Sequence, residues 1–574
     1  MKSFSNFENP EKIYSTYQRF LVDTHRFIKR ESSKYVGGVP LMYDAYNKTL
    51  VVDSEDTHTI VYGSTGSLKS RSVVMPTMRV LGVAGESMII NDSKGELHSK
   101  LALELKEQGY DIIVINFREP ALGDAWNPLY IPFKFYMRGD IDNAAEFAND
   151  IASNLMKGES SGNDPFWDNS AADLLFGLIM LLFKYAKEHN VDYSAVNIGN
   201  IIELRRIIFS SQRRPQDSIL WKYGADDELI SPRLSGSVYA PNDTRNSILS
   251  VFDQKMGSFT IRKTLLDMLA SNDIDIAQIG REKTAVFLIT PDEKTTYHRL
   301  VSLFVKQSYE YLIYTAALNN TNTVDNRINY ILDEFSSLPA INDMPAMISA
   351  ARSRDIRFLL IVQSKHQLKK RYNEEADTII SNCNNWIFLT SRELELLREL
   401  SELCGEKANR LPNISVYDLQ HLSKNLNEAI VLCGRMKPAF VSLLDIDKFG
   451  WKKYGKLPME NRIRQKRERL SFELKPEIKE KLVPIPSIGA PFSSSESNTS
   501  LIPPQIRTVS DANGNSEQVL DIESMIKQID KKIEELEKEE EEQKRAEEAK
   551  KEKKDPPSKV TKKKGTGNKE GDKK

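Results

Sequence analysis

Seven short apolar runs, each followed by a helical segment, constrain the fold of this chain most. Their residues are apolar almost throughout, as expected for strands that are covered on both faces. Strands separated by helices favour right-handed crossovers and a largely parallel sheet. The sequence therefore predicts an α/β fold with a mostly parallel central sheet. The runs are THTIVYG (57–63), ESMIIND (86–92), DIIVINF (111–117), TAVFLIT (284–290), INYILDE (328–334), RFLLIVQS (357–364) and NWIFLT (385–390).

Composition excludes several classes of protein. Lys and Arg (80) balance Asp and Glu (81), so any nucleic-acid surface must be a local patch. Three cysteines in 574 residues make neither a disulfide framework nor a zinc site, which favours a reducing compartment.

The N-terminus has no apolar signal core, and the run LLFGLIMLLF (174–183) has about half of the ~20 residues that a spanning helix needs. We therefore expect this run to be a buried helix and no segment to cross a membrane.

The stretch GSTGSLKS, residues 63–70, has the form of a phosphate-binding loop (P-loop). It follows a strand candidate and begins a helix, which directs backbone N–H groups and the helix N-terminus toward phosphates. Lys69 would reach the β- and γ-phosphates of ATP, and the Ser70 hydroxyl would bind Mg²⁺. The remaining predicted loop residues, with the glycines making the tight turns, are Gly63, Ser64, Thr65, Gly66, Ser67 and Leu68.

Leu68 departs from the usual pattern, which has a glycine at this position. Leu68 still offers its backbone N–H, so we expect the loop to hold phosphates provided that this residue avoids a positive φ. The motif alone leaves two interpretations open, a nucleotide site or a Gly/Ser turn before a helix.

A second set of polar residues follows the later strand candidates. Asp333 and Glu334 end one of them, and we expect Asp333 to hold Mg²⁺ through water while Glu334 polarises the attacking water. Gln363 ends the next candidate and would contact the γ-phosphate. Arg352 and Arg354 precede that strand and are candidate cations for a neighbouring subunit's nucleotide. The alternatives are an exposed acidic pair at a strand end and, for each arginine, a structural ion pair.

The predicted organisation has seven parts. Residues between the third and fourth strand candidates have apolar side chains at helical spacing. We therefore predict that an all-α domain is inserted into the nucleotide-binding domain. Composition changes to a Pro/Ser-rich linker near 455, and Lys-rich sequence follows a short run of apolar residues at alternating spacings of three and four. That run fits a coiled coil or a solvated charged helix equally well. The parts are a soluble N-terminal segment (1–55), the nucleotide-binding domain (56–137 and 276–452), the all-α domain (138–275), the linker (453–518), the charged helix or coiled coil (519–548) and a disordered basic tail (549–574).

From about residue 58 to 445 the chain resembles the type IV secretion coupling proteins of conjugation. These are TraG/TraD-type hexameric ATPases within the RecA-like group that includes the FtsK/HerA translocases. The resemblance rests on the P-loop and the D-E pair, and more particularly on DSKGEL (92–97), WNP (126–128) and PFW (165–167).

The resemblance implies ATP and Mg²⁺ as cofactors, bound between the subunits of a homohexamer. Lys69, Ser70, Asp333, Glu334 and Gln363 would take the nucleotide roles described above, and Arg352, rather than Arg354, matches the arginine that acts on a neighbouring subunit. Single-stranded DNA would pass through a central channel, while the all-α domain would face the relaxase and relaxosome proteins. The chain departs from the family in Leu68, which bears on the hydrolysis rate more than on binding. Residues 1–55 are polar, so we also expect the family's usual N-terminal membrane anchor to be missing.

From the second departure we expect a cytoplasmic protein that a membrane protein of the transfer channel recruits to the inner face of the cell membrane. The N-terminal segment and the coiled-coil region are the candidate contacts. Three functions stay open. The first is an ATP-driven motor that hands single-stranded DNA with its relaxase to a transfer channel. The others are a double-stranded DNA translocase and a docking protein that binds nucleotide without hydrolysing it.

Overall fold

The computed structural model describes residues 7–29, 34–157, 165–291, 293, 295–318, 322–407, 409–447, 454–462, 464 and 467–474, together with the backbone of two strands at 506–510 and 516–520. The chain divides into two compact units, residues 1–483 and 484–574. The first unit holds the sheet, the helices and the P-loop.

A nine-stranded sheet organises the first unit, and it contains all seven predicted strands. Its order is β13-β12-β11-β5-β10-β9-β6-β8-β7. The pairs from β11 to β7 are parallel, and β12 and β13 add an antiparallel hairpin. The predicted mostly parallel α/β fold is therefore confirmed. The strands are β5 (Thr59–Gly63), β6 (Ser87–Asp92), β7 (Asp111–Asn116), β8 (Thr284–Ile289), β9 (Ile328–Leu332), β10 (Ile356–Val362), β11 (Asn385–Thr390), β12 (Glu428–Cys433) and β13 (Ala439–Ser442).

Two apolar cores cover the two faces of this sheet, because alternate residues of each strand point in opposite directions. In β8, Val286 and Leu288 belong to the core that includes helix α13 and the all-α domain. Phe287 and Ile289 belong to the other core, which includes helices α2 and α3 and the N-terminal strands. Apolar residues at every position are therefore required, and this is why the seven strands could be recognised in the sequence.

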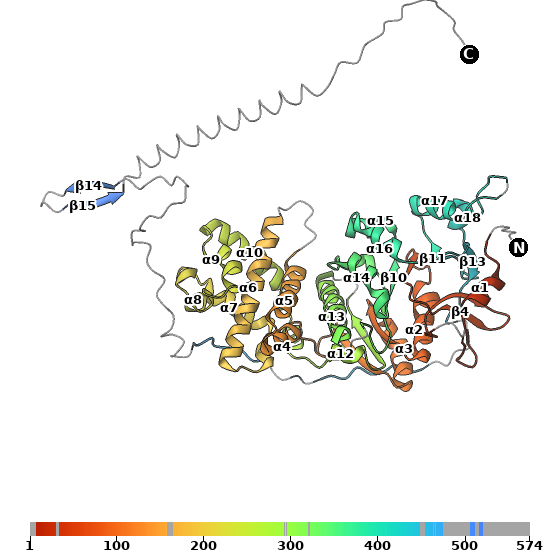
Figure 1. The fold of residues 1–574 in the computed structure, drawn as a ribbon, viewed down its shortest axis with the longest axis horizontal. Coiled ribbons are helices and arrows are strands. Elements are labelled where there is room, and N and C mark those ends of the chain that lie inside the picture. The colour runs from red at the N-terminus through yellow and green to blue at the C-terminus, as the bar shows by residue number, and fades with distance from the viewer. Residues whose placement is uncertain are drawn as a thin grey trace, which may run out of the picture. The chain divides into compact units, whose positions relative to one another are not determined.

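Helices follow the strands and pack over the two faces (Figure 1). The first helix after the P-loop starts as a π-helical turn, Ser70–Val74, and continues as α2. The α-helices of this part are α2 (Met75–Ala84), α3 (Glu96–Glu107), α13 (His298–Leu318), α14 (Met344–Ala351), α15 (Lys365–Tyr372), α16 (Glu375–Asn382), α17 (Leu394–Leu403) and α18 (Val416–Gln420), with short 3-10 turns at Thr295–Tyr297, Phe335–Ser337 and Arg352–Arg354.

The insertion between β7 and β8 contains only helices within its described residues. Its centre is α6, Pro165–His189, which packs against α5, α7, α9 and α10. By length and composition α6 would pass as a membrane span, but 67% of its apolar window is buried in this domain, as a core helix would be. The helices are α4 (Tyr130–Arg138), α5 (Ile141–Met156), α6, α7 (Ile198–Ile208), α8 (Ile219–Gly224), α9 (Ile230–Val238), α10 (Asn242–Thr260), α11 (Lys263–Met268) and α12 (Ile276–Ile279), with 3-10 turns at Tyr193–Ala195 and Pro215–Asp217.

The N-terminal segment forms a small antiparallel sheet of order β2-β1-β4-β3, preceded by α1. A buried arginine joins it to the central sheet by hydrogen bonds to backbone carbonyls. Arg327 donates to the carbonyl oxygens of Ser54 (2.7 Å) and Glu55 (2.7 Å). Next to it, Arg357 pairs with Glu86 at 2.7 Å, both side chains being 5% exposed. The elements are α1 (Pro10–Thr16), β1 (Gln18–Leu21), β2 (Arg26–Ile28), β3 (Val39–Asp44) and β4 (Thr49–Asp53).

The first part of the predicted linker packs against the folded unit. Its described residues between 454 and 474, which we call the strap, lie against the segment after β7 and then against the all-α domain. Arg462 pairs with Asp124 at 2.8 Å, and Arg467 pairs with Asp267 at 2.8 Å. Tyr185 donates its hydroxyl to the Glu473 carbonyl at 3.1 Å. The strap therefore contacts both the nucleotide-binding domain and the all-α domain that is inserted into it.

The second unit contains two paired strands, β14 (Ile506–Ser510) and β15 (Ser516–Leu520). Val519, where the charged helix was predicted to start, lies in β15, so a helix does not begin there. The rest of the predicted helix, residues 521–548, and the predicted tail, 549–574, lie outside the described residues.

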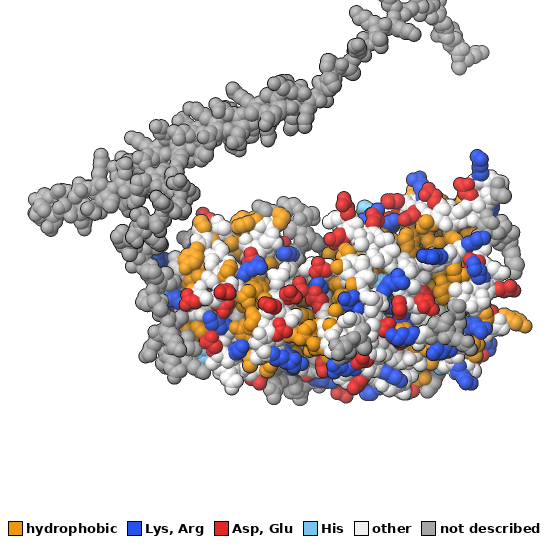
Figure 2. Space-filling view, viewed as in Figure 1, with side chains coloured by type: hydrophobic (Ala, Val, Ile, Leu, Met, Phe, Trp, Pro, Cys, Tyr) orange, Lys and Arg blue, Asp and Glu red, His pale blue; other side chains and the backbone are white. Residues whose placement is uncertain are grey.

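Acidic and basic side chains are interspersed over the face of the first unit seen in Figure 2. This agrees with the near-neutral net charge of the sequence. A phosphate-binding region on this protein must therefore be built from local geometry and cannot depend on a general positive field.

Candidate nucleotide site

The P-loop connects β5 to the π-helical turn at the carboxyl edge of the parallel strands. Ser64 donates its N–H to the Thr390 carbonyl at 3.0 Å, which fixes the start of the loop against β11. A Cβ at Gly63 would lie 2.4 Å from the Ser67 hydroxyl and 2.9 Å from the Lys69 side chain, so a larger residue would force these side chains to shift. The backbone N–H groups of Thr65, Gly66 and Leu68 donate to no acceptor within the described residues. Unpaired N–H groups at the start of a helix favour binding of an anion.

Leu68 adopts a left-handed conformation, with φ 68°. The condition stated for phosphate binding, that this residue avoid a positive φ, is therefore not met. Two left-handed residues, Gly66 (φ 79°) and Leu68, are needed to bring the chain from the strand end to the helix. Gly66 tolerates this conformation without cost, whereas a leucine in it is strained by about 1–2 kcal/mol. The loop shape survives the substitution of the usual glycine, but at a cost in backbone energy.

Lys69 lies buried beneath the loop, with 6% of its surface exposed. Its ammonium group donates to the carbonyl oxygens of Gly63 (2.7 Å) and Ser64 (3.3 Å). Burial lowers the pKa of Lys69, and the carboxylates of Glu334 and Asp333 partly oppose this effect. The ammonium group is thus held by neutral carbonyls close to a pair of carboxylates.

Asp333 and Glu334 follow β9 directly and face the P-loop across the sheet edge. The Ser70 hydroxyl lies 3.5 Å from Asp333 Oδ2. Burial, and then the neighbouring Glu334 carboxylate, raise the pKa of Asp333 to about 6, while Lys69 opposes the shift. A carboxylate and a hydroxyl at this distance are hard oxygen ligands of the kind that Mg²⁺ prefers. Among the described residues no three His, Cys, Asp or Glu side chains gather into a richer metal cluster.

Gln363 connects the loop to the carboxylates. Its amide nitrogen donates to Glu334 Oε2 at 2.6 Å, and its amide oxygen accepts from the Thr65 hydroxyl at 3.4 Å. The bridge follows from strand order, because β10 lies between β5 and β9. A change at Glu334 can therefore reach the P-loop through one side chain.

Arg352 lies apart from these residues. It is exposed in the 3-10 turn before β10, whereas Gln363 follows the same strand at its other end. Seven residues of strand span roughly 20 Å, so Arg352 is at the opposite edge of the sheet from its own P-loop. Arg354 donates to the Ala350 carbonyl at 3.0 Å and the Ser353 hydroxyl at 3.1 Å, which are local hydrogen bonds and not the ion pair considered for this residue.

Asn91, which no sequence motif singled out, also belongs to this site. This residue is buried near the end of β6, and its amide donates to the Asp333 carbonyl at 2.6 Å, which holds the carboxylate-bearing turn in place. Its position near the end of ESMIIND was the available signal, since the ends of parallel strands meet at one edge. Without the strand order β9-β6, however, nothing in the sequence pairs Asn91 with Asp333.

A cavity of about 240 Å³ opens beside the P-loop, on the side of β11. Two hydroxyls that are buried without a hydrogen-bond partner, those of Ser67 and Ser72, belong to residues that line it. Orphaned polar groups in a hollow next to unpaired N–H groups fit a polar ligand. The remaining lining residues are Ser64, Thr65, Gly66, Leu68, Leu389, Thr390, Leu422, Lys424, Asn427 and Glu428.

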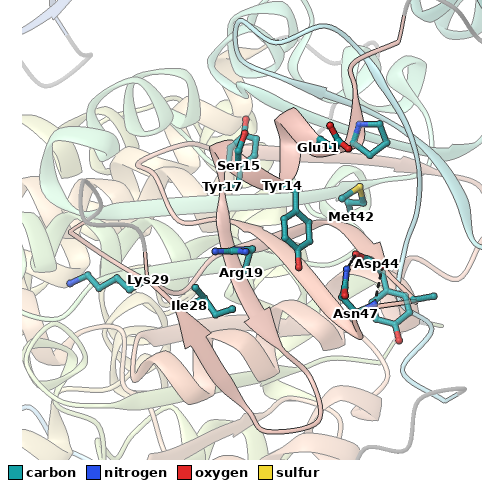
Figure 3. A pocket seen from close by; sticks show the side chains of 13 residues that line it. Glu11, Tyr14, Ser15, Tyr17, Arg19, Ile28, Lys29, Met42, Asp44 and Asn47 are labelled. Carbon is teal, nitrogen blue, oxygen red and sulfur yellow. Dashed lines mark hydrogen bonds between the residues drawn. The ribbon is translucent and has the colours of Figure 1, made fainter.

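A larger hollow, about 770 Å³, lies on the N-terminal sheet and shares no lining residue with this cavity. Figure 3 shows Tyr14 of α1 and Arg19 of β1 beside one another over the strands, and Asp44 bonded to Asn47 at the β3–β4 turn. The Arg19 guanidinium lies 5.1 Å from the centre of the Tyr14 ring. This hollow is separate from the residues that the sequence predicted for nucleotide chemistry.

Comparison with known proteins identifies related chains. A family model described as type IV secretory system conjugative DNA transfer matches residues 4–446. The conjugal transfer protein TraG of Escherichia coli is 24% identical over 363 residues, which cover 61% of this chain and 55% of TraG. Protein VirD4 of Rhizobium radiobacter is 22% identical over 418 residues, covering 71% of this chain and 56% of VirD4. The chain thus matches a little over half the length of these curated relatives.

Solved structures of the plasmid coupling protein TrwB share the fold. One, a complex with a non-hydrolysable ATP analogue, superposes with a TM-score of 0.53 at 17% identity and covers 80% of this chain and 98% of TrwB. Another, an unbound form, gives a TM-score of 0.51 at 17% identity over 75% of this chain and 91% of that one. At this identity the likeness supports the RecA-like α/β fold.

Proposed function

The chain belongs to the family of type IV secretory system conjugative DNA transfer proteins, and from this premise we propose that it is the coupling ATPase of a conjugative system. It would link a relaxase–DNA complex to the transfer channel and drive single-stranded DNA transfer by binding and hydrolysing ATP. The observation that carries the proposal is the convergence of Lys69, Ser70 and Asp333 at one sheet edge, with Ser70 and Asp333 3.5 Å apart.

Each side chain has a role that its surroundings support. Lys69 would exchange its bonds to the Gly63 and Ser64 carbonyls for bonds to the β- and γ-phosphates. Ser70 and Asp333 would hold Mg²⁺, which neutralises charge on the transferring phosphoryl group. A proton on Asp333 competes with the metal, so Mg²⁺ binding would weaken as the pH falls through about 6.

Glu334 and Gln363 would act together on the attacking water. The Glu334 carboxylate would accept a hydrogen bond from the water and so polarise it. Gln363, bonded to Glu334 at 2.6 Å, would hold that carboxylate in place and sense the γ-phosphate through its contact with Thr65. Arg352 would complete the site of a neighbouring subunit in a homohexamer, which is consistent with its exposure at the far edge of the sheet.

The remaining partners follow from family membership. The all-α domain would face relaxase and relaxosome proteins, and DNA binding would be through phosphates, hence salt-dependent and largely independent of sequence. We place the protein at the cytoplasmic face of the cell membrane, in contact with a membrane protein of the channel. Extraction of the membrane fraction with high salt would release a peripherally held chain and leave an integral one behind.

One observation favours a second function, a docking protein that binds nucleotide and does not hydrolyse it. Leu68 holds the P-loop in a strained left-handed conformation that glycine would adopt freely. A loop under such strain can serve binding and assembly in place of turnover.

Steady-state ATP hydrolysis separates the two functions. It would be measured on the purified chain alone, with single-stranded DNA and with duplex DNA. Turnover that single-stranded DNA stimulates and that Lys69→Ala abolishes supports the coupling ATPase. The matched control is Lys48→Ala, a surface lysine paired with Asp23. Stimulation by duplex DNA alone would favour a double-stranded DNA translocase. No turnover in the native chain but turnover in Leu68→Gly would favour the docking protein.

A further inference from the structure

The cavity beside the P-loop lies on the side away from the carboxylates. In the order β12-β11-β5-β10-β9, the P-loop follows β5, while Asp333 and Gln363 follow β9 and β10. The cavity is lined instead by the end of β11 and by the segment that leads into β12. A nucleotide whose γ-phosphate faces Lys69 and Asp333 must direct its other end away from them. That other end consists of the ribose and the base, and the cavity lies on the side of the P-loop toward which they would extend.

The size and chemistry of the cavity suit part of a nucleotide. At about 240 Å³ it is smaller than the roughly 300–1,000 Å³ of complete small-molecule sites, so the phosphates would stay outside it on the loop. Leu68, Leu389 and Leu422 supply apolar surface. Ser67 and Ser72 also line the cavity, and their hydroxyls are buried without a hydrogen-bond partner. A cavity that combines three leucine side chains with several polar residues can hold a ligand that has both apolar faces and polar edges, as a nucleotide base has.

Leu68 is the residue that connects this cavity to the strained backbone. A glycine would relieve the left-handed conformation but would contribute no side chain to the wall. The half-buried leucine side chain lines the cavity instead. Residues with a strained backbone conformation occur most often at functional sites, and Leu68 is such a residue in a loop that would bind a ligand.

We propose that Leu68 is a specificity-determining residue whose side chain packs against the base of the nucleotide that the P-loop holds. This inference rests on the proposed nucleotide site and deepens it. The loop would gain affinity for the base from the same residue that strains its backbone. The P-loop backbone and Lys69 would then bind the phosphates. The side chains of Leu68, Leu389 and Leu422 would contact the base.

The test compares two probes, Mg-ATP and inorganic tripolyphosphate with Mg²⁺, by calorimetry on the full-length chain. Tripolyphosphate carries the phosphates and lacks the base. Losing part of the burial of one leucine side chain should lower the affinity for ATP about tenfold. We expect Leu68→Gly to lower the ratio of ATP to tripolyphosphate affinity by this factor while binding tripolyphosphate at least as well as the native chain does.

Two further variants keep the inference testable. Leu68→Met retains an apolar side chain and should keep the native ratio. Leu422→Ala leaves the P-loop sequence intact and should lower the ratio in the same direction as Leu68→Gly. An unchanged ratio in Leu68→Gly, or an equal loss of affinity for both probes, would overturn the role of Leu68. If the native chain binds neither probe, the proposed nucleotide site itself fails, and that outcome is distinct from the others.

Discussion

The titration of Asp333 gives a quantitative test of the site. Burial and Glu334 raise its pKa from an ordinary 3.8 to about 6, so the folded protein binds this proton more tightly than the unfolded chain. The stability that Asp333 contributes is therefore fully present below pH ~4 and is lost as the pH rises through about 6. A pKa difference of about two corresponds to about 3 kcal/mol at pH 8, which is an upper value because water reaches part of the side chain.

Asp333→Asn removes the ionisation and keeps one side-chain oxygen, which can accept the bond from the Glu334 N–H, while the bond from Ser70 to the second oxygen is lost. We expect the variant to melt at a higher temperature than the native chain at pH 8, and the difference to shrink toward pH 5 with a midpoint near 6. Thermal unfolding between pH 5 and 8 measures this. Asp23→Asn, an exposed carboxylate paired with Lys48, is the control and should show no such profile.

Magnesium provides the second arm of the same experiment. Mg-ATP should stabilise the native chain more at pH 8 than at pH 5.5, because a metal held as we propose would require the ionised carboxylate of Asp333. Asp333→Asn should lose most of the magnesium dependence. A melting difference between variant and native chain that does not vary with pH, or a variant that is less stable at pH 8, would refute the reasoning.

Three further predictions concern other parts of the molecule. Lys69→Ala should weaken ATP binding roughly 10- to 150-fold by calorimetry, since hydrogen bonds to charged groups are worth about 1.5–3 kcal/mol; an affinity equal to that of Lys48→Ala would contradict this. Arg357→Met leaves Glu86 buried without its 2.7 Å partner and should cost about 3–5 kcal/mol, seen as a lower melting temperature, and adding Glu86→Gln should restore part of the loss. If the double variant is no more stable than Arg357→Met, the pair is not what holds this region. Arg467→Ala breaks the 2.8 Å contact with Asp267 and should speed proteolysis within the strap, whereas Arg206→Ala, at an exposed pair within α7, should leave the rate unchanged.

The strands, and the polar residues that follow them at one sheet edge, could be predicted because local rules determine them. A strand with both faces covered must be apolar throughout, and that pattern is visible in TAVFLIT without knowledge of its neighbours. Lys69, Asp333 and Gln363 were found because each follows such a strand, and the carboxyl ends of parallel strands share one edge. The family resemblance came from stretches such as DSKGEL, which lie within the residues matched by the family model.

Only the tertiary structure decided the relations between distant residues. The positive φ of Leu68 depends on how the chain turns between the end of β5 and the start of the following helix. The residue type alone predicts a negative φ. The bridge from Thr65 through Gln363 to Glu334 depends on β10 lying between β5 and β9, an order that differs from chain order. The strap looked like a linker because its contacts are made by side chains spaced irregularly along an extended segment. Local patterns are set by burial of one segment at a time, whereas these features exist only once several segments are in place.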